Sequence, residues 1–299
     1  MTLFDRLVRL GLPLVPKLFV RQVAGRYVAG DSIDAAVRTI RSLREEGSVT
    51  TVDVLGEEVR ERERADAAVA EYLRLLETIS SEGLERNISI KPTMLGLKID
   101  EGFCAERIAQ IVRRASELGA FVRVDMEDHT CTDATLRIYR QLLQEYGKVG
   151  VVLQAYLHRT VPDVAALLPL KPNIRICKGI YREPRDIAWK DFETVRANFV
   201  FAMERLLEGG AFVAIATHDR HLVCAGIAAV DRLGVPPDRY EFQMLLGVDA
   251  GLRKVILGLG HRLRVYVPYG RDWYPYSMRR LRENPSIARH VMRAMVGLS

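Results

Sequence analysis

From residue 31 onward, the chain alternates between two hydrophobic patterns. Short apolar runs rich in Val and Ile predict β-strands, and longer stretches in which apolar residues recur every three or four positions predict amphipathic helices. We expect strands at residues 49–55, 88–95, 121–127, 149–156, 173–181, 211–219, 240–245 and 264–267. We expect helices at residues 33–43, 60–79, 105–118, 132–146, 191–207, 221–233 and 249–259.

Eight strands that alternate with helices over a chain of this length predict an α/β fold of the (β/α)8 TIM-barrel type. We expect a distorted barrel that forms the catalytic domain at residues 31–299, with the last helix over the barrel mouth. A doubly wound sheet is the alternative. It is weakened because no Gly-x-Gly-x-x-Gly motif follows the first strand.

Residues 1–30 predict a separate, basic helical arm. They contain five basic residues and one acidic residue, a net charge of +4 out of +6 for the whole chain. Arg6 and Arg9 interrupt the apolar run that a signal peptide would need, and no stretch has the roughly 20 apolar residues of a membrane span. The arm either caps the fold or lies on an anionic membrane surface.

The composition is that of a globular protein with a large core, because 48% of the residues are hydrophobic and 27% are charged. With 44 Lys and Arg against 38 Asp and Glu, the chain is only mildly basic, so nucleic acid binding is not indicated. The four cysteines form no Cys-x-x-Cys pair, which argues against a disulfide framework or a zinc site. We therefore predict a cytoplasmic protein, with the arm as a means of peripheral contact with the inner face of the cell membrane.

Polar and charged residues follow nearly every predicted strand. In a TIM barrel, the carboxyl ends of the strands carry the chemistry. The residues at these ends are Lys91, Asp125, Gln154, Arg175, Lys178, Thr217, His218, Glu241 and Gln243. Several lie within apolar runs, where a charge is costly unless it is paired. For Glu127, Asp128, His129 and Asp219 we prefer the ordinary explanation of a polar loop end.

This set of residues contains several cations, one or two carboxylates and a single histidine. It lacks the multiple histidines of a metal site and a serine beside a base, so metal-dependent hydrolysis and acyl transfer are not indicated. The set suits an anionic cofactor and an anionic substrate, with the cofactor supplying the reactivity.

A second candidate site lies near the C-terminus. Tyr276, Arg279, Arg280 and Glu283 have the spacing of one helix face, and four aromatic residues precede this helix closely. A solvated, salt-bridged surface is one interpretation. We prefer a pocket for a small anion, because aromatic walls beside paired arginines can grip a carboxylate in two places.

Several motifs resemble those of the proline dehydrogenase family in its monofunctional bacterial form. They are Arg-Ile-Cys-Lys-Gly-Ile-Tyr, Ala-Thr-His-Asp, Glu-Phe-Gln-Met-Leu, Arg-Val-Tyr-Val-Pro-Tyr-Gly and Arg-Arg-Leu-Arg-Glu-Asn, at residues 175–181, 216–219, 241–245, 264–270 and 279–284. The resemblance implies FAD-dependent oxidation of L-proline to Δ1-pyrroline-5-carboxylate, the first step of its degradation to glutamate. It further implies hydride transfer from C5 to flavin N5 and reoxidation of the flavin by membrane quinone. Contact between the basic arm and the membrane would then have a function.

The resemblance also implies roles for individual residues. Asp125 and Arg175 would be catalytic, with Arg175 stabilising negative charge near flavin N5. The substrate residues would be Lys91, Arg279 and Arg280 at the proline carboxylate, Tyr266 and Tyr276 against its ring, and Glu283 orienting an arginine. The cofactor contacts would be Met126, Gln154, Arg175, Lys178, Gly179, Ile180, Thr217 and His218. No metal is implied, and the acceptor of the substrate's amine proton is left open.

Two residues depart from the family pattern. Ile180 stands where the family usually has a small residue, so FMN remains an alternative to FAD. Pro92 follows Lys91, where a strand would donate a backbone hydrogen bond, which affects the placement of Lys91. The rival functions are another (β/α)8 enzyme acting on a phosphorylated substrate, and a non-catalytic module that binds membranes or anions.

Overall fold

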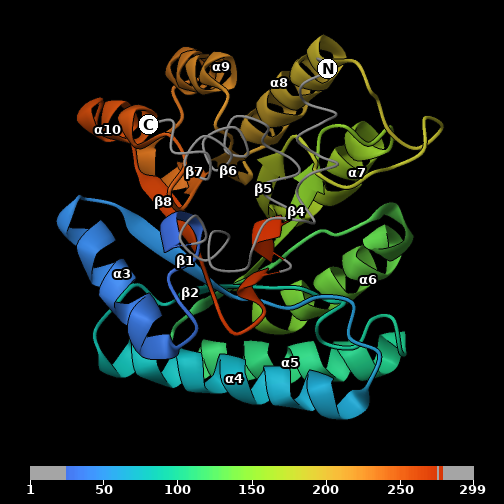
Figure 1. The fold of residues 1–299 in the computed structure, drawn as a ribbon. Coiled ribbons are helices and arrows are strands. Elements are labelled where there is room, and N and C mark those ends of the chain that lie inside the picture. The colour runs from blue at the N-terminus through green and yellow to red at the C-terminus, as the bar shows by residue number, and fades with distance from the viewer. Residues whose placement is uncertain (1–24, 275, 279–299) are drawn as a thin grey trace, which may run out of the picture.

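Eight parallel strands close into a barrel in the computed structural model, which describes residues 25–274 and 276–278 (Figure 1). Each strand pairs with its neighbours in sequence order, and β8 pairs back onto β1. The strands are β1 (Val49–Val54), β2 (Asn87–Ile90), β3 (Phe121–Val124), β4 (Val149–Gln154), β5 (Asn173–Cys177), β6 (Phe212–Ala216), β7 (Tyr240–Leu245) and β8 (Leu263–Tyr269). Closure confirms the predicted TIM-type barrel and excludes the doubly wound sheet.

Helices surround the barrel and follow its strands (Figure 1). They are α3 (Ile33–Glu45), α4 (Arg62–Ser81), α5 (Glu101–Glu117), α6 (His129–Tyr146), α7 (Thr160–Leu167), α8 (Phe192–Glu208), α9 (Arg220–Arg232) and α10 (Ala250–Gly258). Most begin at an acidic or serine N-cap; Asp100, for example, accepts a hydrogen bond from the Phe103 amide at 2.7 Å. These caps hold the loops that bring side chains to the barrel mouth.

The main core lies between the strands and the helices. Val and Ile side chains on the outer face of the strands pack against one apolar stripe of each helix. On α4, that stripe includes Tyr72, Leu75, Leu76 and Ile79, all fully buried. The residues on the inner face of the strands are different, because they include buried arginines and carboxylates.

The predicted strands are correct in number and position, but the first six are too long at their carboxyl ends, whereas the eighth is predicted to end at residue 267 and continues to Tyr269. The structure ends β2 at Ile90 and turns the chain at residues 92–99, so Pro92 interrupts no strand. Lys91 therefore begins a loop above the barrel. The short helix α7 was not among the predicted ranges, because it has eight residues and a proline in its first turn.

Residues 25–30, at the end of the predicted arm, pack on the barrel. Tyr27 and Val28 are buried, and the Ala29 amide donates a hydrogen bond to the Pro268 carbonyl at 2.9 Å. Residues 1–24, which form the rest of the arm, and the last predicted helix from residue 279 lie outside the described residues. The division into arm and barrel domain stays a prediction.

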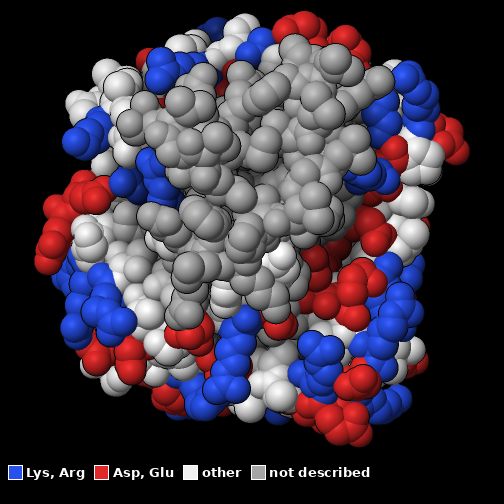
Figure 2. All heavy atoms as spheres, in the orientation of Figure 1, with Lys and Arg blue, Asp and Glu red and all other residues white. Residues whose placement is uncertain are grey.

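Charged side chains of both signs are interspersed around the visible rim of the molecule (Figure 2). Many form ion pairs between neighbouring helices, such as Arg114 with Glu77 at 2.5 Å and Arg232 with Glu204 at 2.6 Å. Among the described residues, every helix is too short or too polar to traverse a lipid bilayer.

Candidate active site

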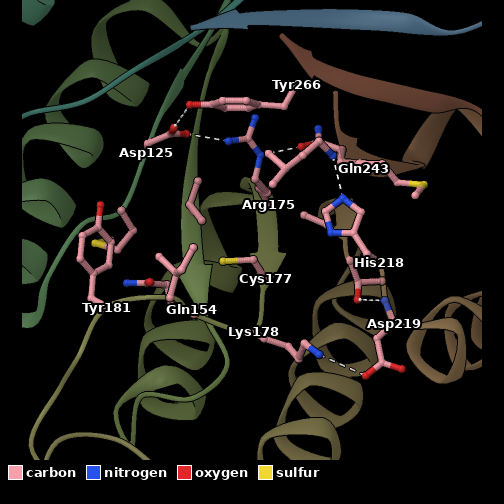
Figure 3. A pocket seen from close by; sticks show the side chains of 18 of the residues that line it. Asp125, Gln154, Arg175, Cys177, Lys178, Tyr181, His218, Asp219, Gln243 and Tyr266 are labelled. Carbon is pink, nitrogen blue, oxygen red and sulfur yellow. Dashed lines mark hydrogen bonds and ion pairs between the residues drawn. The ribbon is translucent and has the colours of Figure 1, made fainter. Parts of the chain in front are cut away.

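A cavity of about 730 Å³ lies at the carboxyl ends of the strands. Its lining comes from β4 to β8 and from the loops that follow β2, β3, β5 and β6. The volume is in the range of small-molecule and cofactor sites, about 300–1,000 Å³. Figure 3 shows Tyr266 and Lys178 at opposite ends of this cavity, with Arg175, Cys177 and His218 between them.

Every predicted site residue within the described part of the chain lines this cavity. These residues are Lys91, Asp125, Met126, Gln154, Arg175, Lys178, Gly179, Ile180, Thr217, His218, Tyr266 and Tyr276. The other three, Arg279, Arg280 and Glu283, lie outside the described residues. Their roles stay predictions.

Arg175 on β5 is the centre of the hydrogen-bond network in the cavity floor. Its guanidinium donates to Asp125 Oδ1 at 2.6 Å and to Gln243 Oε1 at 2.5 Å (Figure 3). It also donates to Ser89 Oγ at 2.9 Å. The Arg175 Cζ atom also lies 5.3 Å from the Tyr266 ring centroid, over the ring face. A planar group fixed on three strands has one orientation, so its positive charge is held in place before any ligand arrives.

Tyr266 on β8 extends the network toward Lys91. Its hydroxyl donates to Asp125 Oδ2 at 3.0 Å and accepts from Lys91 Nζ at 3.3 Å. Burial raises the pKa of Tyr266 well above its ordinary value, and the Asp125 and Asp53 carboxylates raise it further. Tyr266 therefore stays protonated and remains a donor to Asp125 at physiological pH.

Lys91 makes its strongest contacts with Asp53 on β1. Its ammonium nitrogen lies 2.6 Å from Asp53 Oδ1 and 2.5 Å from Oδ2. Burial alone would lower the pKa of Lys91, but the carboxylates of Asp53 and Asp125 raise it above its ordinary value. Lys91 is therefore a buried cation that is paired with Asp53.

The opposite end of the cavity carries a second group of charges. Asp219 binds Lys178 Nζ at 3.1 Å and the Arg196 guanidinium at 2.8 Å. The hydrogen bonds from Arg196 lower the pKa of Asp219 to about 2, with Lys178 adding to the effect. Both cations also lie over the ring of Phe192, with Lys178 Nζ at 4.8 Å and Arg196 Cζ at 4.3 Å from its centroid. Arg196 also pairs with the exposed Glu193 at 3.0 Å, so the two cations at this end lie beside two carboxylates.

The loops after β5 and β6 bring backbone atoms close to the cavity. Gly179 has φ +106°, and a Cβ atom there would lie 2.2 Å from the Tyr156 ring, so only glycine fits. The Leu245 amide donates to His218 Nε2 at 2.8 Å, which assigns the proton of the neutral imidazole to Nδ1. The Thr217 hydroxyl accepts from the Asp219 amide at 3.1 Å. These contacts fix the loop conformations locally.

The four residues expected to be ordinary polar loop ends have distinct structural roles. Asp128 and Asp219 are the N-caps of α6 and α9. His129 pairs with Glu183. Glu127 differs most from the expectation, because it is 2% exposed and accepts two hydrogen bonds from Thr93, at 2.6 and 2.8 Å. Burial raises the pKa of Glu127 to about 7 despite these bonds.

Sequence reasoning missed three residues that the structure brings to the site. They are Asp53, Phe192 and Arg196. A charge within the apolar strand sequence Val-Thr-Thr-Val-Asp-Val was the available signal for Asp53. Phe192 and Arg196 lie one turn apart on α8. The sequence around them has the pattern of an ordinary solvent-exposed helix face, so it gave no signal of a site. Among the described residues, no cluster of three His, Cys, Asp or Glu side chains could hold a metal ion.

The family model described as proline dehydrogenase matches residues 36–293. Proline dehydrogenase 1 of Bacillus subtilis is 36% identical over 273 residues, which cover 91% of this chain and 90% of that protein. Proline dehydrogenase of Deinococcus radiodurans is 37% identical over 279 residues, with coverages of 92% and 90%. The chain belongs to the proline dehydrogenase family. This confirms the predicted family and enzyme class, and makes the chain an oxidoreductase that acts on proline.

Solved structures share the fold of this proline dehydrogenase. Proline utilization A from Bdellovibrio bacteriovorus, inactivated by N-propargylglycine, superposes with a TM-score of 0.82 at 25% identity, covering 87% of this chain. The corresponding protein from Corynebacterium freiburgense superposes with a TM-score of 0.77 at 22% identity, covering 97% of this chain. The chain spans about a third of the length of each, 32% and 34% respectively. The barrel fold is therefore common to both.

Proposed function

We propose that this enzyme oxidises L-proline at C5, with FAD as the hydride acceptor and quinone as the final electron acceptor. The product would be Δ1-pyrroline-5-carboxylate. The observation that carries the proposal is the arrangement of charge along one cavity. A buried network around Arg175 lies at one end, and the cations Lys178 and Arg196 lie at the other.

The residues that line the cavity fit a flavin dinucleotide. Lys178 and Arg196 offer positive charge suited to a diphosphate, and Gly179 lines the cavity next to Lys178. Phe192 is 52% exposed beside these cations, so it offers an aromatic surface for a second ring system beyond the phosphates. That surface favours FAD over FMN, whose single ring system would leave it uncovered.

Arg175 has the position and partners to stabilise negative charge in the cavity. It is 6% exposed, and its three side-chain hydrogen bonds fix its orientation. A bound flavin would supply the hydride acceptor. The contribution of Arg175 is a preorganised cation in a site of low dielectric constant, where charge stabilisation is strongest. Asp125 holds both Arg175 and the Tyr266 hydroxyl, and so aligns the two.

The substrate end combines an aromatic wall with charged groups. The rings of Tyr266 and Tyr276 line the cavity beside Lys91, which suits a small ring bearing a carboxylate. Asp53 and Asp125 offset the charges of Lys91 and Arg175, so these four groups are together neutral. The substrate carboxylate then requires additional cations, and the proposal assigns this role to Arg279 and Arg280. Peripheral membrane contact through the arm rests on its charge alone.

The visible absorption spectrum of the purified protein tests the proposed function directly. We expect flavin bands that bleach when L-proline is added without oxygen, and that return when a soluble quinone is added. Mass spectrometry of the released flavin should identify FAD. D-proline serves as the control and should leave the bands unchanged on the same timescale. A protein that stays colourless after incubation with FAD and FMN would contradict the proposal.

Replacing Lys178 with methionine is expected to weaken flavin binding about tenfold or more, because a charge-assisted hydrogen bond contributes about 1.5–3 kcal/mol. The dissociation constant can be measured by quenching of flavin fluorescence. Lys254→Met, on α10 outside the cavity lining, is the matched control and should bind flavin normally. Equal affinity in the two variants would remove Lys178 from the cofactor site.

A further inference from the structure

Asp53 is the most deeply buried charged residue of the site. It lies near the carboxyl end of β1, level with Ser89 on β2 and Pro268 on β8, and its exposed fraction is 0%. It is not part of the cavity lining. An ionised carboxylate at such a depth is unstable unless it is paired and hydrogen-bonded.

The partner of Asp53 is Lys91, and both carboxylate oxygens of Asp53 take part in the contact. Both carboxylate oxygens lie within 2.6 Å of the ammonium nitrogen. The Tyr72 hydroxyl of α4 donates to Oδ1 of Asp53 at 3.4 Å. Because one ammonium hydrogen-bonds two oxygens of a side chain held on a strand, the end of the flexible lysine side chain is held in place.

Lys91 lies at a boundary between two cavities. It lines the cavity of about 730 Å³ and also a second one of about 190 Å³ that Tyr276 shares. An unrestrained lysine could direct its ammonium group into either space, or onto Asp125. The contact with Asp53 and the 3.3 Å contact with the Tyr266 hydroxyl restrict it to one direction.

We propose that Asp53 is the positioning residue for Lys91: it fixes the ammonium group beside the Tyr266 hydroxyl, at the substrate end of the cavity, and keeps that group charged. The inference rests on the proposed function, since it assigns Lys91 to the substrate. Asp53 itself touches no substrate. Its effect passes through the direction and the charge of Lys91.

Other charged and titratable groups surround Lys91, and the proposal must hold in their presence. Those nearest to it across the two cavities or acting on its charge include Asp53, Glu57, Arg64, Asp125, Glu127, Arg175, Tyr266, Asp272 and Tyr276. Of the carboxylates, Asp53 makes the shortest contacts with the Lys91 ammonium. Its removal therefore has the largest expected effect on the charge of Lys91.

The expected consequence is a new pH dependence in Asp53→Asn. In the native protein the carboxylates outweigh burial and raise the pKa of Lys91. Without Asp53, burial dominates and the pKa falls, so the ammonium charge is lost as the pH rises. The Michaelis constant for proline should then rise about tenfold between roughly pH 7 and pH 9 in the variant and stay nearly constant in the native enzyme. The dissociation constant of tetrahydrofuran-2-carboxylate, an unreactive analogue, should change in parallel.

Asp163→Asn is the matched control. Asp163 is also buried and also paired in two places, with Arg159 at 2.7 and 3.1 Å, but it lies on α7 outside the cavity lining. The Asp163→Asn substitution should leave the pH dependence of the Michaelis constant for proline unchanged. An identical profile in Asp53→Asn and in the native enzyme would overturn the inference, whereas a native enzyme that proline does not bleach would overturn the proposed function instead.

The double variant Asp53→Asn with Lys91→Met provides a test that needs neither flavin nor turnover. Lys91→Met alone leaves the Asp53 carboxylate buried without its cation, so its unfolding midpoint in urea should fall. Adding Asp53→Asn removes the unpaired charge and should restore part of that loss. A double variant no more stable than Lys91→Met would contradict the proposed pairing.

Discussion

Replacing Arg175 with methionine is expected to lower the turnover number about 100- to 1,000-fold, the usual loss when a preorganised donor to developing charge is removed. The variant loses a cation and its hydrogen bonds to Asp125, Gln243 and Ser89 together. It also leaves the negative charge of Asp125 balanced only by more distant groups. Stopped-flow measurement of flavin bleaching by proline would give the rate of reduction directly.

Two further variants separate the charge of Arg175 from its shape. Arg175→Lys keeps the charge but cannot span three partners, so its rate should lie between those of the native enzyme and Arg175→Met. Arg159→Met removes an ion-paired arginine at the N-cap of α7, outside the cavity lining, and should reduce flavin at the native rate. Reduction of Arg175→Met within threefold of the native rate would exclude Arg175 from the catalytic step.

The fold was predictable because a TIM barrel repeats one local pattern eight times. Each strand is a short apolar run bounded by helix signals, and most helices end close to the predicted residues. The strand ends were not predictable in detail. Lys91, Asp125 and Lys178 were included in predicted strands, because the alternation of apolar and polar residues continues past the last paired residue. The end of a strand is set by its neighbours' hydrogen bonds, which the local pattern does not contain.

The cavity-lining residues were predictable where they follow a strand, since the barrel brings all such positions to one face. Their partners were not. The contact between Arg175 and Ser89 joins residues 86 positions apart, and the contact between Lys91 and Tyr266 joins residues 175 apart. Such pairs depend on how far each strand is staggered around the barrel. Periodicity within a single segment carries no information about that stagger.

The interior of the barrel contains a continuous hydrogen-bonded chain of charged and polar groups. It passes from Arg264 through Glu241 and Gln243 to Arg175, and then through Asp125, Tyr266 and Lys91 to Asp53. Each carboxylate in it lies between cations or donors, which is what makes burial of so many charges possible. The orientation of Arg175 and Asp125 therefore depends on groups outside the cavity lining, such as Glu241 and Asp53.

Glu241 is the buried carboxylate on which the lower half of this chain depends. It is 2% exposed and accepts from Arg264 Nε at 2.7 Å and from Gln243 Nε2 at 2.6 Å. Burial alone would raise its pKa, but Arg264, Gln243 and Arg262 lower it below the ordinary value. A carboxyl group whose pKa is lowered by folding stabilises the fold above its unfolded pKa, and this stabilisation is lost as the pH falls through the folded pKa.

Glu241→Met is therefore expected to lower the free energy of unfolding by about 3 kcal/mol at neutral pH. This value is near the lower limit for breaking a buried ion pair, because Arg264 keeps its contact with Glu85 in the variant. Urea unfolding would measure the loss, which should shrink as the pH falls below the unfolded pKa of about 4.3 and disappear only below the lower pKa of the folded carboxyl group. Glu77→Met breaks an exposed pair with Arg114 and should cost less than about 1 kcal/mol.

In folded Glu241→Met, Gln243 loses its acceptor, so flavin reduction should slow, but less than in Arg175→Met. Native stability in this variant would mean that Arg264 finds sufficient compensation in Glu85 and the Thr50 carbonyl, which it contacts at 3.0 and 2.6 Å.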